Sequence, residues 1–318
     1  MKRSLVAAML AAIACNGNAQ EQSAKPVRFL VGYAPGGSVD ITARIVAEAA
    51  SVTLKQPIVI ENRAGGVGLL AITALRREPA DGNTVLITPE ATLYQPMLHR
   101  ELDFDAMRDM LPLGILTNAP IVLASHPGTG EKSIAELISR AKAQPGQMVY
   151  ALPAATGTPA VAAAVFFNAA GIKLTAVPYK GGASLLADLI GGQVPLAVLG
   201  VAALGSHTKS GRVRLLAVTS KARSRLLPEV PALAELGYPN MDMTQWFGAM
   251  VAAGTPPATV TRLSTALMDA LKNPTVIQKL GASGLEIVGA GPDEMSRRMA
   301  VEMKEWARTA VAADVLKN

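Results

Sequence analysis

The chain has 318 residues, of which 50% are hydrophobic, 17% are charged and 4% are aromatic, and its formal net charge is +6. Its basic residues are scattered, with small clusters only at Arg76-Arg77 and from Lys221 to Arg225, so the basic patches with stacking rings that are typical of nucleic-acid binders are missing from the sequence. A chain of this length exceeds the size at which one hydrophobic core usually stops growing, so two lobes are expected.

The first nineteen residues predict a secretory signal peptide. Lys2 and Arg3 precede an apolar stretch from Leu5 to Cys15, and Gly17-Asn18-Ala19 has the small-x-small pattern of a signal peptidase site. The apolar stretch is shorter than the roughly 20 residues that a permanent membrane anchor needs. We therefore expect residues 1–19 to be removed and the mature protein to be exported and soluble.

The only cysteine, Cys15, lies inside the predicted signal peptide. The mature chain is thus expected to form no disulfide and to have no thiolate for catalysis or metal binding. The run Ala12-Ile13-Ala14-Cys15 weakly resembles a lipoprotein processing site. Because Ala12 stands where a larger aliphatic residue is usual, cleavage after Ala19 is preferred over lipidation of Cys15.

Short apolar runs alternate with helical patterns along the chain, which is typical of an α/β protein with mostly parallel sheets. The expected strands are Val27–Tyr33, Ile58–Glu61, Thr84–Thr88, Leu113–Leu116, Ile121–Ala124, Met148–Ala151, Leu174–Pro178, Leu196–Gly200, Val213–Thr219, Gly248–Ala252 and Leu285–Val288. The expected helices are Val39–Thr53, Leu69–Arg77, Ile134–Ala143, Ala160–Ala169, Ser184–Ile190, Ala202–Ser210, Ala232–Leu236, Pro257–Lys272, Thr275–Ala282 and Pro292–Ala312.

Two apolar strands are expected to cross between the lobes. Ile121–Ala124 ends in turn residues, and Leu215–Thr219 is followed by a polar stretch. These crossings predict that residues 26–120 together with 222–318 form lobe 1, and that residues 121–221 form lobe 2. A ligand cleft is then expected between the lobes, outside the carboxyl ends of the parallel strands.

The stretch from Val27 to Asp40 contains the strongest candidate for a binding site. An apolar strand breaks at Pro35-Gly36-Gly37, and a helical pattern begins at once. Glycines allow close approach of the backbone, and the new helix contributes free N–H groups and the positive end of its dipole. The junction is suited to an anion, with a carboxylate as the first candidate, although a turn that binds nothing remains an alternative.

Three further loops follow strands and precede helices in the same way. They are Thr88–Thr92, Ala151–Pro159 and Pro178–Gly182, and all are rich in small or hydroxyl-bearing residues. If these loops surround one cleft, the helices that follow them would present several N-termini that can bind anions. Ordinary connections between strands and helices are the alternative.

Motifs for catalysis and cofactors are weak. The run Gly66–Ala71 matches a dinucleotide fingerprint, but the loop Asn62–Gly65 separates it from the strand that it should follow directly, so no cofactor is expected. His99, His126 and His207 lie far apart in the sequence without a second ligand at metal-binding spacing, so no metal is expected either.

Six motifs occur along the mature chain in a characteristic order: VGYAPGGSVDITAR, VIENRAGGVGLLA, ADGNTVLI, PYKGGASLLADLIGGQV, LLAVTSKARSRLLPEVPALAELGYP and GTPPATVTRL. In order and spacing, from about Pro26 to the end, the chain resembles the extracytoplasmic solute receptors of tripartite tricarboxylate transporters, the Bug-type receptors. The resemblance implies a two-lobed periplasmic binding protein with a type II-like α/β fold and a ligand cleft between the lobes. It also implies a non-enzymatic receptor that binds a small carboxylate, or an amine or amide analogue, and delivers it to membrane transporter subunits. We expect a periplasmic monomer without cofactor, metal or nucleic acid.

The resemblance, together with the loops, gives a set of candidate ligand-binding residues. Tyr33 is expected to form a wall of the pocket, backbone N–H groups of the loop to hold the carboxylate, and Asp40 to fix the loop from the first helical turn. The loops at 88–92 and 154–158 are expected to contact the far end of the ligand. The full set is Tyr33, Ala34, Pro35, Gly36, Gly37, Ser38, Asp40, Thr88, Glu90, Thr92, Ala154, Ala155, Thr156, Thr158 and Tyr179, with Gly36, Gly37 and Ser38 as the backbone donors.

The chain departs from the family pattern at two of these loops. Leu152-Pro153-Ala154-Ala155-Thr156 has fewer donors than the Ser- and Gly-rich loop of relatives that hold a second carboxylate, and Glu90 is an acid in a loop that is usually neutral. We therefore hypothesise that the far end of the ligand is apolar or amine-bearing. Two alternatives stay open: an exported hydrolase with Glu90 or Asp40 as its base, and a ligand sensor for a signalling partner.

Overall fold

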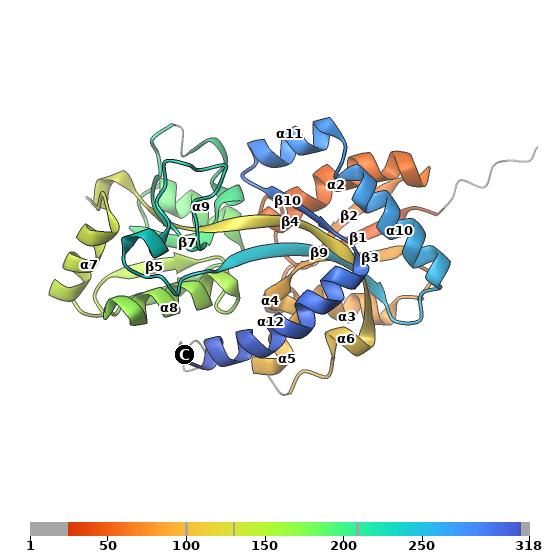
Figure 1. Ribbon diagram of the computed structural model, residues 1–318, viewed down its shortest axis with the longest axis horizontal. Coiled ribbons are helices and arrows are strands. Elements are labelled where there is room, and N and C mark those ends of the chain that lie inside the picture. The colour runs from red at the N-terminus through yellow and green to blue at the C-terminus, as the bar shows by residue number, and fades with distance from the viewer. Residues whose placement is uncertain (1–24, 99–100, 130, 208–209, 313–318) are drawn as a thin grey trace, which may run out of the picture.

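The computed structural model describes residues 25–98, 101–129, 131–207 and 210–312. The predicted signal peptide, residues 1–19 with Cys15, lies outside the described residues. Two α/β lobes lie side by side, joined by long strands that run from one lobe to the other (Figure 1). The expected two-lobed α/β architecture is confirmed.

Each predicted strand has a counterpart in the structure. The strands are β1 (Val27–Val31), β2 (Ile58–Asn62), β3 (Thr84–Pro89), β4 (Met110–Ser125), β5 (Val149–Leu152), β6 (Thr175–Pro178), β7 (Leu196–Gly200), β8 (Arg214–Val218), β9 (Thr244–Ala252) and β10 (Glu286–Ala290). The main departure is that Leu113–Leu116 and Ile121–Ala124 belong to one strand, β4.

The α-helices are α2 (Ser38–Leu54), α3 (Leu69–Arg77), α4 (Glu90–Leu93), α5 (Gln95–Leu98), α6 (Ala106–Asp109), α7 (Ile134–Ala143), α8 (Thr158–Ala170), α9 (Gly182–Ile190), α10 (Pro257–Ala270), α11 (Pro274–Ala282) and α12 (Pro292–Ala312). The 3-10 helices are η1 (Gly66–Gly68), η2 (Pro127–Thr129), η3 (Val201–His207) and η4 (Leu233–Leu236). The sequence analysis missed α4, α5 and α6 because a four-residue helix is too short to show a hydrophobic period.

The sheets are mixed rather than mostly parallel. In lobe 1, β2, β1 and β3 are parallel neighbours, and in lobe 2 β5 is parallel to β6 and to β7. The strands β4 and β9 pair antiparallel with their neighbours. They connect the strands of the two lobes into one sheet with the order β2-β1-β3-β9-β4-β7-β5-β6. The expectation of mostly parallel sheets fails because these two strands, which connect the lobes, run in opposite directions.

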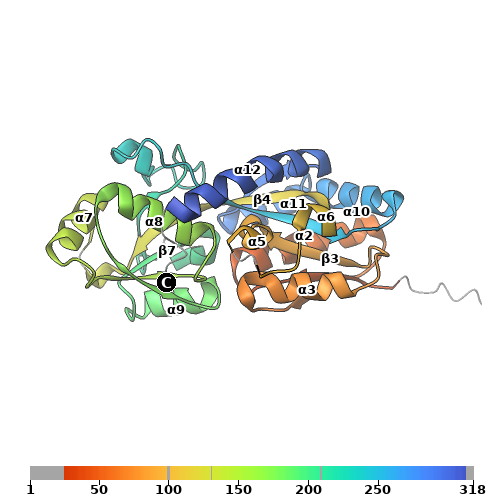
Figure 2. The same ribbon diagram turned by 90° about the horizontal axis from the view of Figure 1, so that it is seen from below.

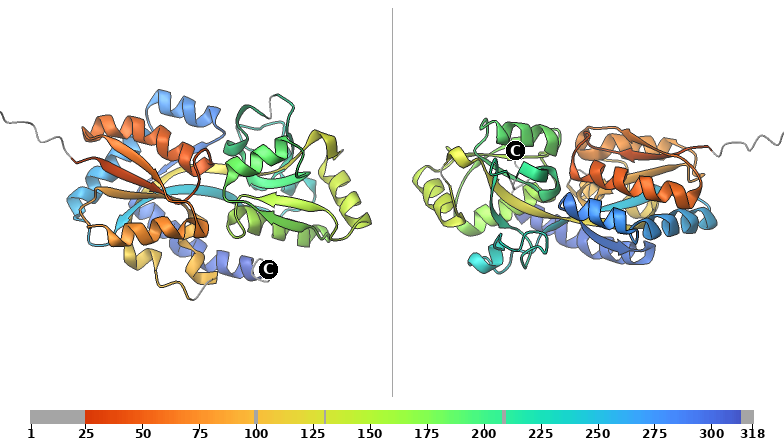
Figure 3. Two further views of the ribbon diagram at one scale, coloured as in Figure 1. Left: turned by 180° about the vertical axis from the view of Figure 1, so that it is seen from behind. Right: turned by 90° about the horizontal axis from the view of Figure 1, so that it is seen from above.

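The strand β4 spans sixteen residues and includes Ile121–Ala124, the first predicted crossing. Its first part, from Met110 to Pro120, pairs with β9, and its last part, from Ile121 to Ser125, pairs with β7 and β8. The yellow strand runs from one lobe into the other in Figure 3, left. One continuous strand therefore contributes to the cores of both lobes.

The second crossing is β9 and not β8, which corrects the sequence-based expectation. The strand β8 pairs with β4 inside lobe 2, and the segment after it stays there: Ala232 bridges to Val218, and Leu233 and Met241 lie in the lobe 2 core. The sequence pattern could not separate the two strands because both are short apolar runs. The lobe boundaries at 121 and 221 stay a prediction, and these contacts favour a second boundary near Thr244.

Each lobe buries apolar side chains on both faces of its sheet. In lobe 1, one core lies under α2, α10 and α11, and the other lies under α3 and α12. In lobe 2, one core lies under α7 and α8, and the other lies under α9 and η3. The helix α12 extends from lobe 1 along the crossing strands and contacts α8 of lobe 2 (Figure 2).

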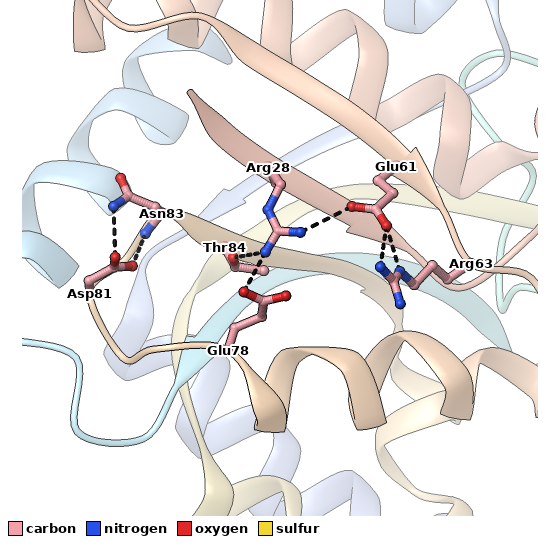
Figure 4. Close-up of polar contacts among 7 residues, drawn as sticks. All are labelled: Arg28, Glu61, Arg63, Glu78, Asp81, Asn83 and Thr84. Atoms are coloured by element: carbon pink, nitrogen blue, oxygen red, sulfur yellow. Dashed lines mark hydrogen bonds and ion pairs between the residues drawn. The ribbon is translucent and has the colours of Figure 1, made fainter. Parts of the chain in front are cut away.

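A polar cluster ties together the three parallel strands of lobe 1 (Figure 4). Arg28 of β1 lies 2.6 Å from Glu78 and 3.3 Å from Glu61 of β2, and it donates to Thr84 of β3 at 3.0 Å. The side chains of this cluster are about one-third exposed, so each ion pair contributes modestly to stability.

Two glycines allow the segment after β1 to pack against the start of α3. A Cβ atom added to Gly32 would lie 2.5 Å from the Cα of Gly68, which has a φ of +90°. Gly68 belongs to the run that resembled a dinucleotide fingerprint, and in the structure it provides close backbone packing. This contact fixes the end of β1, where the loop that leads to α2 begins.

Gly32→Ala is expected to destabilise the protein by about 1–3 kcal/mol, because the added methyl group would clash with backbone that cannot move freely. Gly281→Ala is the control, since a Cβ there meets nothing within 4 Å and alanine is favoured in a helix. Urea unfolding of both variants measures the difference. Equal stabilities would contradict the packing argument.

Candidate functional site

A cleft between the lobes brings together loops from both. Its empty volume, which includes open solvent, is about 630 Å³. Lining residues come from segments 33–39 and 89–91 of lobe 1, 153–159, 181–182 and 199–200 of lobe 2, and 245–247 of β9. The segments lie far apart in the sequence, and the two crossing strands place them around one space.

None of the described residues that line the cleft has a charged side chain. Instead, the first turns of three helices contribute to the lining: α2 through Ser38 and Val39, α8 through Pro159, and α9 through Gly182. The N-terminus of a helix carries free N–H groups and a partial positive charge. The cleft is therefore suited to an anion that is held by peptide groups.

The start of α2 presents the clearest set of donors. Gly37 is the N-cap residue and has no side chain to cap the helix, and the first helical bond runs from the N–H of Ile41 to the carbonyl of Gly37. The N–H groups of Ser38, Val39 and Asp40 precede that bond and have no acceptor within the helix. Gly37, Ser38 and Val39 all line the cleft.

Asp40 contacts the loop that precedes its own helix. Its carboxylate accepts hydrogen bonds from the N–H of Gly36 at 2.9 Å, from Arg44 at 2.9 Å and from Asn62 at 2.8 Å. Asn62 also donates to the carbonyl of Tyr33 at 3.0 Å. Burial of Asp40 raises its pKa, but the hydrogen bonds and the Arg44 charge outweigh burial, so the net pKa is lowered. The carboxylate therefore stays ionised and acts as a brace for the loop.

The backbone donor role predicted for Gly36 needs correction. Its N–H is already donated to Asp40 and it does not line the cleft. Pro35 also lies outside the lining, whereas Tyr33 and Ala34 lie within it. The sequence could not show that Asp40 reaches back to the loop before its own helix.

The start of α9 faces the same loop from lobe 2. A Cβ atom added to Gly181 would lie 3.5 Å from the Cβ of Ala34, and one added to Gly36 would lie 3.6 Å from the Cβ of Ala183. The starts of α2 and α9 thus approach each other across the cleft. Gly181 and Gly182 were absent from the candidate residues, although the Pro178–Gly182 loop had been singled out by its glycines.

Tyr179, from that same loop, does not line the cleft. Its hydroxyl donates to Asp188 of α9 at 2.6 Å, and this hydrogen bond together with burial raises the pKa of Tyr179 to about 12. Its role in the structure is to brace α9, which corrects the expected ligand contact.

The threonines of the α8 loop are used in contacts between the lobes. Thr156 lines the cleft and donates to the side chain of Gln95 in lobe 1 at 3.2 Å. Thr158 is buried and donates to Glu90. Ala154 lines the cleft, whereas Ala155 is exposed outside it.

Thr88 and Thr92, expected at the far end of the ligand, are both buried and lie outside the lining. Thr88 donates to the carbonyl of Pro89 at 3.3 Å. Thr92 donates to the carbonyl of Val67 at 2.9 Å and shares a 2.9 Å hydrogen bond with the hydroxyl of Tyr33. Val67 has a φ of +53°, so these contacts hold a strained loop and keep the Tyr33 ring in place.

Glu90 does not face the cleft either. Its side chain is 3% exposed and faces a second cavity behind the cleft, where it accepts hydrogen bonds from Thr158 and from the N–H of Trp246 at 3.0 Å. Burial raises the pKa of Glu90 to about 8, with a further contribution from the nearby Glu302 and against the opposing effect of its hydrogen bonds. Neither acid proposed as a hydrolytic base, Glu90 or Asp40, lines the cleft.

The sequence analysis missed Gln245 of β9 as a site residue. It lines the cleft beside Ser38, and both approach Gly200 at the end of β7: a Cβ added to Gly200 would lie 3.1 Å from the Ser38 hydroxyl and 3.6 Å from the Gln245 amide oxygen. A single glutamine carries no recognisable motif, so only the crossing of β9 through the cleft could reveal it.

Within the described residues, no group of three or more histidine, cysteine, aspartate or glutamate side chains is placed to hold a metal ion. No helix in this part of the chain combines the length and apolar character needed to cross a membrane.

The family model described as "Tripartite tricarboxylate transporter family receptor" matches residues 42–313. The chain belongs to this family. It is 32% identical to protein BugT of Bordetella pertussis over 93% of this chain and 92% of BugT. The expected family is confirmed, and the protein is a periplasmic solute receptor from a family of solute-binding proteins and not of enzymes.

Solved structures agree with the receptor fold. An R. palustris protein solved with adipate has a TM-score of 0.86 and 31% identity, covering 92% of this chain and 98% of that one. The structure of the periplasmic binding protein BugD matches with a TM-score of 0.86 and 27% identity. The match covers 91% of this chain and 98% of BugD.

The environment of Glu90 predicts a pH dependence of stability. Its pKa is raised in the folded state, so its stabilising contribution is complete below the unfolded-state pKa of about 4.5 and is lost as the pH rises toward 8. The titratable or charged groups around its cavity are Tyr94, Asp242, Arg298 and Glu302. Between pH 5 and 8, the wild-type protein should lose a few kcal/mol of unfolding free energy relative to Glu90→Gln.

Urea unfolding of both proteins at several pH values measures this difference. Glu294→Gln, at an exposed position of α12, is the control and should follow the wild-type curve. Parallel curves for wild type and Glu90→Gln would contradict the raised pKa.

Proposed function

We propose that this receptor binds an organic carboxylate between its lobes and delivers it to the membrane subunits of a tripartite tricarboxylate-type transporter. The convergence of the starts of α2 and α9 on an uncharged cleft carries the proposal. Two helix starts from opposite lobes can hold one carboxylate between them, and this favours closure of the lobes around the ligand. The adipate bound to the R. palustris relative supports carboxylate as the ligand class.

The proposed carboxylate contacts are the backbone N–H groups at Gly37, Ser38 and Val39, with Gly182 contributing from the other lobe. Tyr33 and Ala34 form the adjacent wall. Gly36 is left out because its N–H is already donated to Asp40.

The far end of the ligand is proposed to be apolar or a neutral amide. Phe247, Leu199 and Pro159 supply apolar surface there, and Gln245 offers one uncharged donor and acceptor. Pro159 at the start of α8 lines the cleft and has no N–H to donate, which lowers the capacity of this helix start to bind a second carboxylate. The amine-bearing alternative has little support, since no described lining residue is acidic.

The mature protein is proposed to reach the periplasm by cleavage of the signal peptide after Ala19 and to act as a monomer without catalysis. Every segment of the cleft comes from one chain, so a single copy can complete the site. Mass spectrometry of small molecules that co-purify with the protein would identify its natural ligand.

Gly37→Asp is expected to weaken carboxylate binding on the order of a hundredfold, because a like charge would occupy the anion site. The fold should tolerate it: Gly37 has a φ of −81°, a Cβ there meets only the carbonyl of Ala34 at 3.8 Å, and aspartate is a favoured N-cap residue. Calorimetry with hexanoate and adipate is the measurement. Gly37→Asn is the matched neutral control and should lose less than about tenfold, and equal losses in both variants would argue against a charge effect.

A matched series of ligands tests whether the far end of the ligand is neutral. Hexanoate, adipate and the monoamide of adipate share one carboxylate and differ at the other end. We expect hexanoate or the monoamide to bind more tightly than adipate in calorimetry, because the second carboxylate of adipate would lose its hydration without gaining a cationic partner in the cleft lining. Tighter binding of adipate than of both would overturn the neutral far end while leaving the carboxylate site intact.

A further inference from the structure

Glu90 lies behind the cleft at a point where both lobes and a crossing strand meet. One carboxylate oxygen accepts the hydroxyl of Thr158 from lobe 2, and the other accepts the N–H of Trp246 from β9 at 3.0 Å. The neighbouring residues face the opposite way: Ala91, Gly157 and Pro159 line the cleft. Glu90 and Thr158 therefore connect the rear sides of two segments whose front sides form the ligand site.

We propose that Glu90 is a positioning residue that holds the start of α8 against lobe 1 and favours the closed arrangement of the lobes without touching the ligand. The hydrogen bond from Thr158 to Glu90 joins two lobes and can exist only while they are together. The bond from Trp246 keeps the carboxylate aimed at Thr158, since β9 is held in the sheet on both sides.

The surroundings of Glu90 allow it to switch between two environments. The cavity behind the cleft has about 990 Å³ of empty space, open solvent included, and it is lined by Glu90, Thr158 and polar side chains such as Asn240 and Thr244. When the lobes separate, water in this space can hydrate the carboxyl group. Opening therefore breaks the Thr158–Glu90 hydrogen bond, together with the bond from Thr156 to Gln95, and does not require lobe 1 to unfold.

The far wall of the same cavity is fixed by a second carboxylate. Glu302 of α12 accepts the hydroxyl of Tyr94 at 2.9 Å and the indole N–H of Trp246 at 2.8 Å. Trp246 is thus held by Glu90 at its backbone and by Glu302 at its ring. This arrangement holds the lobe 1 side of the contact in place at two points of Trp246.

The test measures the distance between the lobes in the ligand-free protein, so its failure is distinguishable from a failure of the proposed carboxylate binding. Spin labels at Val52→Cys of α2 and Ser139→Cys of α7 lie on exposed positions of the two lobes, and Cys15→Ser removes the only native cysteine. Double electron–electron resonance then gives the closed and open populations.

Thr158→Val is expected to lower the closed-to-open ratio about tenfold, the usual effect of losing a hydrogen bond to an ionisable group. Glu90→Ala should give the same shift, and the double variant should shift no further than either single variant. Glu90→Gln should retain most of the closed population, because an amide can accept from Trp246 and donate to Thr158. Thr175→Val, which removes a hydroxyl contact confined to lobe 2, is the control and should match the wild type.

A wild-type distance distribution in Thr158→Val overturns the proposal, as does an additive shift in the double variant. Should Glu90→Ala fail to fold, Thr158→Val alone decides the question, because its side chain lies on the other lobe and valine keeps its shape. Circular dichroism of each variant establishes that it is folded.

Discussion

The antiparallel pairing of β4 with β9 is the constraint on which the rest of the structure depends. It runs from Met110 opposite Ala252 to Pro120 opposite Thr244, with register shifts between Pro112 and Gly114 and between Ile115 and Thr117. The strand β4 then continues into the sheet of lobe 2. Both crossings are strands held in sheets, so the lobes are joined by hydrogen-bonded backbone and not by loops. That connection sets the starts of α2 and α9 opposite each other, and it brings Gln245 into the space between them.

The acidic side chains near the cleft lie behind its lining and not in it. Asp40 accepts three hydrogen bonds at the rear of the α2 loop, and Glu90 accepts two behind the start of α8. An acid near a helix N-terminus stabilises that helix. At α2 the acid is itself neutralised by Arg44, so the helix start still offers its N–H groups to an anion. At α8, burial raises the pKa of Glu90 to about 8, so this acid adds little negative charge at neutral pH. Pro159 leaves the start of α8 with one N–H fewer for a second anion.

These two arrangements give the lobes different tasks. The loop of lobe 1 is fixed before any ligand arrives, because Asp40, Asn62 and the Tyr33–Thr92 pair hold it from several sides. Lobe 2 contributes through α8 and α9, which contact lobe 1 through Thr156, Thr158 and Gly181. Such a division lets a receptor recognise a carboxylate on a rigid surface and then respond to it by closing.

The sequence by itself determined the positions of the strands and longer helices, the two-lobed α/β class and the glycine loop at the start of α2, because hydrophobic period and turn residues are local properties. The family was indicated separately, by the resemblance of six motifs in their order along the chain. Only the tertiary structure decided that β9 and not β8 returns to lobe 1, that Glu90, Thr92 and Tyr179 turn away from the cleft, and that Gln245 enters it. The direction in which a side chain points depends on which strands pair and which helices lie against them. Those contacts join residues that are far apart along the chain, and no local pattern records them.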